Sequence, residues 1–210
     1  MVSLISQGQY LVFALLLIAL LLSLSFHEYG HALVAKLEGD DTAQRQGRLT
    51  LNPVKHVDLS GLVMVILIGI GYAKPVPVDP RNFKSFYSDL RVALAGPGMN
   101  LLLAILSWNL FLYLESQGVN SENVALFFII FAQINLLLMA FNLIPIGPLD
   151  GNYVLPYFLP KKISHHYRVL NAKYGVWTFL ILLVLAYAVL PLEDYIGSYS
   201  IWMLEKISWV

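Results

Sequence analysis

The chain has 210 residues, of which 58% are hydrophobic and only 12% charged, and its formal net charge is zero. A soluble fold of this size could not remove so much apolar surface from water, so we expect the lipid bilayer to be its solvent. The neutral charge balance gives no indication of a nucleic-acid partner. The chain contains no cysteine, which excludes disulfides and thiolate metal sites.

Four apolar stretches are long enough to cross a membrane, which takes about 20 apolar residues. In chain order they cover residues 10–26, 92–114, 123–147 and 174–192. The residues before the first stretch include no Lys or Arg, so we interpret it as a retained helix rather than a cleaved signal, continuing to about Ala35. The sequence therefore predicts an all-α polytopic membrane protein with about four transmembrane helices.

Smaller features lie between and after these spans. Residues 47–53 (GRLTLNP) alternate like a short strand, which predicts a short membrane-associated β-hairpin after the first helix. The run 59–72 is short and rich in glycine, so we expect it to re-enter the membrane, with an unusually short full span as the alternative. The tail 193–210 carries Trp202 and Trp209 among polar residues, which predicts an interfacial helix.

The basic residues predict the orientation of the spans. Every Lys and Arg except Lys206 follows the first span, the short run or the third span, whereas loop 115–122 has none. Four spans with both termini outside place these basic loops in the cytoplasm, and a fifth full crossing would put one of them outside. We therefore expect one membrane-embedded domain over residues 1–210, in the cytoplasmic membrane, with its core at about residues 10–152 and an extra helix at 174–192.

The first span ends in the motif HEYGH at residues 27–31. His27 and His31 are four residues apart, so on a helix they share one face and can bind one metal ion. Glu28 lies beside them, where it could accept a proton from water at that metal. Lys36 marks the expected end of the helix, and His27 lies roughly 13 Å deeper at a rise of about 1.5 Å per residue. The cluster is therefore predicted inside the membrane, near its cytoplasmic side.

A metal at this pair needs a further ligand, because catalytic zinc usually has three from the protein. His56, His165, His166 and several carboxylates are candidates, and Asp150 in NLIPIGPLDG is the best one, since it follows the third span at the same depth. The prolines and glycines around it break the helix and let the carboxylate turn inward, although the same pattern also fits an ordinary turn. A packed polar cluster or a proton relay are the alternatives for the whole group, but burying three ionisable groups is costly and indicates function.

The sequence resembles the site-2 proteases, a family of intramembrane zinc metalloproteases, and specifically its small prokaryotic members without a PDZ domain. The resemblance runs in the family's order over about residues 25–152. Its segments are HEYGH at 27–31 (family HExxH), RLTLNPVKHVDLSG at 48–61, GYAKPVPVDPRNF at 71–83, AGPGMN at 95–100 (family GPxxN) and NLIPIGPLDG at 142–151 (family NxxPxPPLDG). Gly147 stands where the family commonly has proline, which leaves Asp150 and Asn142 in register.

The resemblance implies that His27, His31 and Asp150 bind one Zn²⁺ per chain and that Glu28 is the general base and acid of peptide hydrolysis. It also implies a catalytic role for Asn142, whose amide could stabilise an oxyanion near the metal. An interhelical hydrogen bond is the alternative for Asn142. The equivalent polar residue of the GPxxN segment, Asn100, is expected to serve helix packing.

The predicted function is therefore cleavage of peptide bonds in or near the transmembrane segments of membrane proteins. A transmembrane helix hides its peptide carbonyls and must unwind first. Segment 47–53 could hold the unwound chain by β-augmentation, or it could be a structural hairpin alone. The expected partners are membrane-protein substrates and the bilayer, and a homo-oligomer is allowed.

Two other functions stay open from the sequence. An inactive metal-binding scaffold is one, although metal binding alone does not require Glu28. A proton or ion transporter is the other, and it would need a paired ionisable group within another span, of which Asp150 at a helix end is the nearest instance.

Overall fold

The structure, a computed structural model, describes residues 1–68, 71, 73–119, 121–189 and 192–209. Within these residues the chain is almost wholly helical. Four helices are long and apolar enough to cross a membrane: α2 (Tyr10–Leu37), α5 (Ser88–Ser116), α6 (Glu122–Asn142) and α8 (Lys161–Val189). Uncharged runs form helices in a bilayer because no water is present to satisfy free backbone groups. The predicted all-α polytopic architecture is confirmed.

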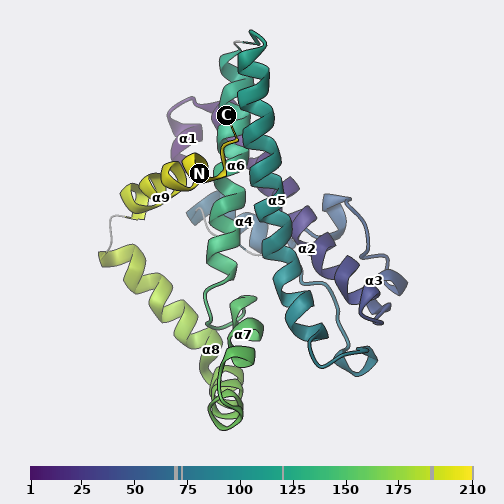
Figure 1. Cartoon of the computed structure of the whole chain (residues 1–210). Coiled ribbons are helices and arrows are strands. Elements are labelled where there is room, and N and C mark those ends of the chain that lie inside the picture. Colours follow the sequence, from purple (N-terminus) through teal and green to yellow (C-terminus); the bar gives the residue numbers. More distant parts are fainter. Residues whose placement is uncertain (69–70, 72, 120, 190–191, 210) are drawn as a thin grey trace.

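Helices α2, α5 and α6 form the central bundle, while α8 diverges from it (Figure 1). Small residues line the bundle interior, including the fully buried Ala19, Ala104 and Ala132. At Gly30 of α2, an added Cβ would lie 2.8 Å from the Ala95 carbonyl oxygen of α5. Such small residues let membrane helices approach closely. This close approach brings the end of α2 that carries HEYGH against the first turns of α5.

Shorter helices connect and flank the bundle. They are α1 (Val2–Ser6), α3 (Thr42–Arg45), η1 (Pro53–Lys55), α4 (Leu59–Ile68), η2 (Pro80–Asn82), α7 (Gly151–Val154), η3 (Leu155–Phe158) and α9 (Leu192–Ile207). The 10 residues of α4 rise about 15 Å, roughly half of the hydrocarbon thickness of a bilayer. The helix is thus too short to span by itself. Residues 69–70 and 72 of the same run lie outside the described part, so its re-entry stays a prediction.

The predicted β-hairpin after the first helix is wrong. No strand occurs in the described residues around 47–53, and the chain there forms an irregular turn that leads into η1. Side chains take the groups that a hairpin would pair: the His56 ring nitrogen Nε2 bonds the Thr50 carbonyl, and the Asn52 side chain accepts from the Val54 N–H. The only pairing described nearby is one antiparallel bridge between Val57 and Ala73.

Two helix boundaries also differ from those expected. Helix α6 ends at Asn142, five residues before the predicted end of the third span, because Pro145 cannot continue the helical hydrogen bonds. Helix α8 begins at Lys161, well before the predicted start at residue 174, so its first turns are polar. The division of the chain into one domain remains a prediction.

The predicted tail helix exists as α9, and its end returns to α5. The Asn109 side chain donates to the Ile207 carbonyl and accepts from the Trp209 N–H, and the Trp108 indole donates to Ser208 Oγ. Whether α9 lies at the membrane interface remains a prediction.

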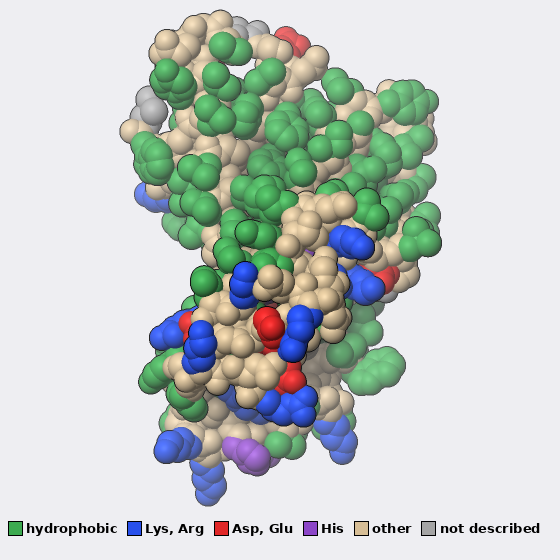
Figure 2. Space-filling view, turned by 90° about the vertical axis from the view of Figure 1, so that its right-hand side faces the viewer, with side chains coloured by type: hydrophobic (Ala, Val, Ile, Leu, Met, Phe, Trp, Pro, Cys, Tyr) green, Lys and Arg blue, Asp and Glu red, His purple; other side chains and the backbone are tan. Residues whose placement is uncertain are grey.

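Apolar and basic side chains separate along the molecule. Figure 2 shows hydrophobic side chains over the upper part of one face, whereas Lys and Arg gather toward its lower end. Much of α8 is exposed apolar surface, for example Val176 at 54% and Trp177 at 68% exposure. Lipid would cover such a surface, and the basic end would stand on one side of the bilayer.

Candidate metal centre

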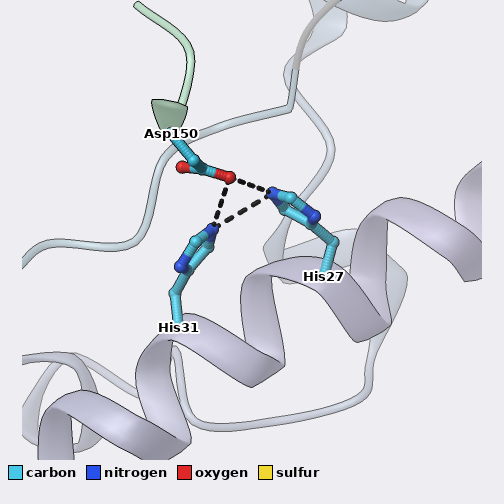
Figure 3. A group of neighbouring side chains, drawn as sticks. All are labelled: His27, His31 and Asp150. Carbon is cyan, nitrogen blue, oxygen red and sulfur yellow. Dashed lines mark hydrogen bonds and ion pairs between the residues drawn. The ribbon is translucent and has the colours of Figure 1, made fainter. Parts of the chain in front are cut away.

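Three side chains converge where α2 meets the loop after α6. His27 and His31 project from one face of α2, and Asp150 reaches them from the residue before α7 (Figure 3). The two Nε2 atoms lie 3.1 Å apart, and Asp150 Oδ2 lies 3.2 Å from that of His27 and 3.3 Å from that of His31. Among the residues that the structure describes, His27, His31 and Asp150 form a group that could hold a metal ion. The structure therefore brings together the three residues predicted as ligands.

The distances fit zinc. Ligand atoms at about 2.0–2.1 Å from a tetrahedral ion are about 3.3 Å from one another. The three separations in this site fall within about 0.2 Å of that value. Asp150 Oδ2 is also buried and accepts no hydrogen bond. A buried carboxylate oxygen without a donor is costly, and a cation beside it would remove the cost.

Hydrogen bonds at the far side of each ring fix which nitrogen carries the proton. His31 Nδ1 lies 2.7 Å from the Val92 carbonyl, which can only accept, so this nitrogen is the donor. His27 Nδ1 lies 2.6 Å from Asn100 Oδ1 and donates to it. In the neutral rings both Nε2 atoms then present lone pairs to each other and to the carboxylate. Lone pairs on both nitrogens beside a carboxylate favour the binding of one cation between them. Histidines that bind metals usually donate their other ring N–H to an acceptor that orients the ring, as the Val92 carbonyl and Asn100 do in this site.

The Asn100 amide is oriented by a buried network across three helices. Its Nδ2 donates to Asn135 Oδ1 at 2.8 Å and to the Ser23 carbonyl at 3.3 Å. The Asn135 amide is in turn fixed because its Nδ2 donates to the Phe131 carbonyl and to Ser23 Oγ. The Asn100 oxygen must therefore face His27. Packing was the role predicted for Asn100, and the contact with His27 adds a second one.

Glu28 is buried beside His27 and His31, at 8% exposure, and its carboxylate contacts a backbone group of another segment. Its Oε2 accepts a hydrogen bond of 2.9 Å from the Val76 N–H. Val76 belongs to residues 74–82, an extended segment ending in η2 that we call the strap. The strap thus holds the carboxylate of Glu28 through its backbone.

The strap is itself anchored at both ends. Near its start, the Lys74 N–H donates to the His56 carbonyl and Arg48 donates to the Lys74 carbonyl. Near its end, the fully buried Asp40 accepts from the Asp79 N–H and from Asn82. Burial acts to raise the pKa of Asp40, but hydrogen bonds from Thr42, Asn82 and Asp79 together hold it below its ordinary value. The anchor is therefore a charged acceptor at neutral pH.

Other candidates from the sequence lie outside the group. Asn142 ends α6, and among the described residues its side chain bonds only the Leu138 carbonyl of its own helix. Its catalytic role stays a prediction. His165 and His166 are exposed on α8, and His56 is buried against Thr50. Sequence reasoning missed Asn135 and Ser23. A polar Asn within an apolar span was the available signal, since such residues usually have partners inside the bundle.

Fold and site together define a multi-pass membrane protein with a buried His–His–carboxylate group inside the bundle. The chain belongs to peptidase family M50, the site-2 protease family, because the model of this family matches residues 15–122 and 115–187. The resemblance drawn from the motifs is thereby confirmed. Membership in this family and the four apolar helices make the chain a membrane metalloprotease.

Curated relatives carry the same class of name. The "Putative zinc metalloprotease YwhC" of Bacillus subtilis is 39% identical over 193 residues, covering 89% of this chain and 84% of that protein. Rip2 of Mycolicibacterium smegmatis, with the same description, is 36% identical over 182 residues, or 83% of this chain and 67% of the relative. Rip2 of Mycobacterium tuberculosis is 34% identical over 183 residues, which cover 83% of this chain and 68% of that relative. No solved structure matches the chain.

Proposed function

We propose that this protein is an intramembrane zinc protease that hydrolyses peptide bonds in or near transmembrane segments of other membrane proteins. The observation that carries the proposal is the convergence, at 3.1–3.3 Å, of His27 and His31 on the membrane-spanning helix α2 with Asp150, the residue before α7. In this proposal the three side chains hold one Zn²⁺ per chain. Zinc, when bound, would polarise the scissile carbonyl and acidify a water molecule.

Glu28 supplies the proton transfers in this mechanism. Its carboxylate takes a proton from the attacking water and returns it to the leaving nitrogen of the peptide. The Val76 N–H occupies one oxygen of Glu28, which fixes the orientation of the carboxylate and leaves the other oxygen to act. Asn142 would assist as an amide donor to the oxyanion after a rotation away from the Leu138 carbonyl.

The membrane sets the requirements for the substrate. A transmembrane helix must unwind before its carbonyls are accessible, because its backbone groups are bonded internally. The site lies at the end of α2 nearest Lys36, toward the basic end of the molecule, so we place it on the cytoplasmic side of the cell membrane. The proposed partners are membrane-protein substrates and the surrounding lipid.

Metal removal tests the proposal. The full chain in detergent micelles should cut a reporter transmembrane substrate, lose activity after zinc chelation, and regain it on addition of Zn²⁺ at one equivalent. Mass spectrometry of the products would locate the cut relative to the reporter's apolar segment. A chain that binds zinc but cuts none of several unrelated transmembrane reporters would favour the scaffold. A chain that moves protons or ions across vesicles in the absence of cleavage would favour the transporter.

The strap offers a test of how Glu28 is oriented. Val76→Pro removes the single N–H that contacts Glu28, in a segment whose neighbours Pro75 and Pro77 already favour extended backbone. Since a hydrogen bond to a charged group contributes about 1.5–3 kcal/mol, we expect cleavage to fall about tenfold or more. Zinc content should not change. Initial rates and metal analysis on the same preparation would measure both.

Val78→Pro is the matched control. Val78 lies two residues further along the strap, and its N–H donates to no described residue. This variant also adds a proline but should cut at nearly the wild-type rate. Equal losses in the two variants would mean that strap conformation matters, and that the hydrogen bond to Glu28 does not.

A further inference from the structure

The loop that carries Asp150 is held by α8, a helix that the mechanism above does not use. Asn171 contacts both sides of one residue in this loop: its Oδ1 accepts from the Gly147 N–H at 3.0 Å, and its Nδ2 donates to the Gly147 carbonyl at 3.3 Å. One turn earlier on α8, the Tyr167 hydroxyl donates to the Pro145 carbonyl at 2.8 Å. We call Asn171 with its two bonds to Gly147 the clasp.

Glycine at residue 147 is required for the clasp. Gly147 has φ +61°, a left-handed conformation that side chains disfavour, and an added Cβ would lie 2.7 Å from the Gly175 carbonyl oxygen of α8. Proline, which the resembling family segment commonly has here, can neither adopt this φ nor donate to Asn171. Gly175 is also required, since its own Cβ would lie 2.5 Å from Asn171 Oδ1. Gly147, Asn171 and Gly175 therefore form one matched set in this chain.

The clasp matters because it ties the loop to a separate helix, whereas the described backbone hydrogen bonds of the loop are made within residues 139–152. In the described part of the chain, the side-chain hydrogen bonds made to residues 143–149 all come from α8, through Asn171 and Tyr167. Asp150 follows directly, and its Oδ2 must stay within a few tenths of an ångström of its place to contact both ring nitrogens at 3.2 and 3.3 Å. By contrast, His27 and His31 are fixed on α2 and by hydrogen bonds to α5.

We propose that Asn171 is a positioning residue for Asp150, so that α8 determines how tightly the centre binds its metal. This inference rests on the metal centre proposed above. The two histidines form a fixed half of the centre, and Asp150 forms a half whose position depends on the clasp. Loss of the clasp should weaken metal binding without touching any ligand.

The test compares zinc affinity in Asn171→Ala and in a matched control. The full chain in detergent is stripped of metal, and Zn²⁺ is titrated in competition with a chromophoric chelator. Partners that orient metal ligands typically alter affinity 10–100-fold, and we expect the lower end, about a tenfold rise in Kd, for Asn171→Ala. Thr178→Ala removes an exposed polar side chain from α8 two turns further on and should leave Kd unchanged.

Thermal unfolding of the metal-free proteins separates positioning from plain stability. An Asn171→Ala chain that is less stable without metal, yet binds Zn²⁺ as tightly as wild type, would overturn the role of Asn171. If that variant does not fold, Asn171→Asp replaces it: the carboxylate can still accept from the Gly147 N–H but loses the donor to the Gly147 carbonyl, so Kd should rise severalfold, and an unchanged Kd would again overturn the proposal. A wild-type chain that binds no zinc would instead overturn the proposed function itself.

Discussion

Replacement of Glu28 by glutamine is expected to abolish cleavage while the chain keeps its zinc. Glutamine has nearly the same shape and can still accept from the Val76 N–H, so the strap should stay in place. It cannot take a proton from water at neutral pH, and a general base contributes about 10²–10⁴-fold to rate. Initial rates on a transmembrane reporter, with metal analysis of the same sample, would measure the effect.

Glu115→Gln controls for the loss of a negative charge. Glu115 is exposed near the end of α5, away from the basic end of the chain, and its replacement should leave the rate unchanged. Cleavage by Glu28→Gln at the wild-type rate would remove Glu28 from the mechanism. Loss of zinc from the same variant would mean that the carboxylate supports the centre rather than the proton transfer.

The parts of this fold that could be predicted are those in which local pattern decides structure. An uncharged run of sufficient length has to be helical in a bilayer, which is why all four spans could be located. Residues four apart on a helix share a face, so the convergence of His27 and His31 followed from the motif alone. The turn pattern around Asp150 fits an ordinary turn equally well, so its placement beside them was inferred from its depth after the third span together with HEYGH, and the family resemblance implied the same role.

The predictions that failed, or could not be made, concern which groups pair with one another through hydrogen bonds. Alternation in residues 47–53 suggested a strand, but a strand also needs a partner, and here the side chains of His56 and Asn52 satisfy the local backbone groups instead. The contact between Asn100 and His27 joins residues 73 positions apart, and no spacing rule connects them. The same holds for the clasp, in which Asn171 and Gly147 lie 24 positions apart.

Replacement of Gly96 by alanine is expected to weaken zinc binding strongly. An added Cβ would lie 2.6 Å from His27 Cε1 and 2.7 Å from its Nε2, and closer still to His31 Nε2. Neither ring can retreat easily, because Asn100 and the Val92 carbonyl hold their Nδ1 atoms. Displacement of both ligating nitrogens should raise the Kd for Zn²⁺ on the order of 100-fold or more, at the upper end of what orienting contacts control. Equilibrium titration of the metal-stripped chain would measure it.

Gly98→Ala on the same helix is the matched control. No heavy atom lies within 4 Å of a Cβ added at Gly98, and the residue is exposed. Alanine there should leave zinc affinity unchanged and, as a better helix former by about 0.5–1 kcal/mol, should not reduce stability. Both variants add one methyl group to the AGPGMN stretch of α5 within two residues of each other. A difference in zinc binding between them therefore reports on the face of α5 that meets the two histidines. Wild-type zinc affinity in Gly96→Ala would mean that the zinc site lies elsewhere.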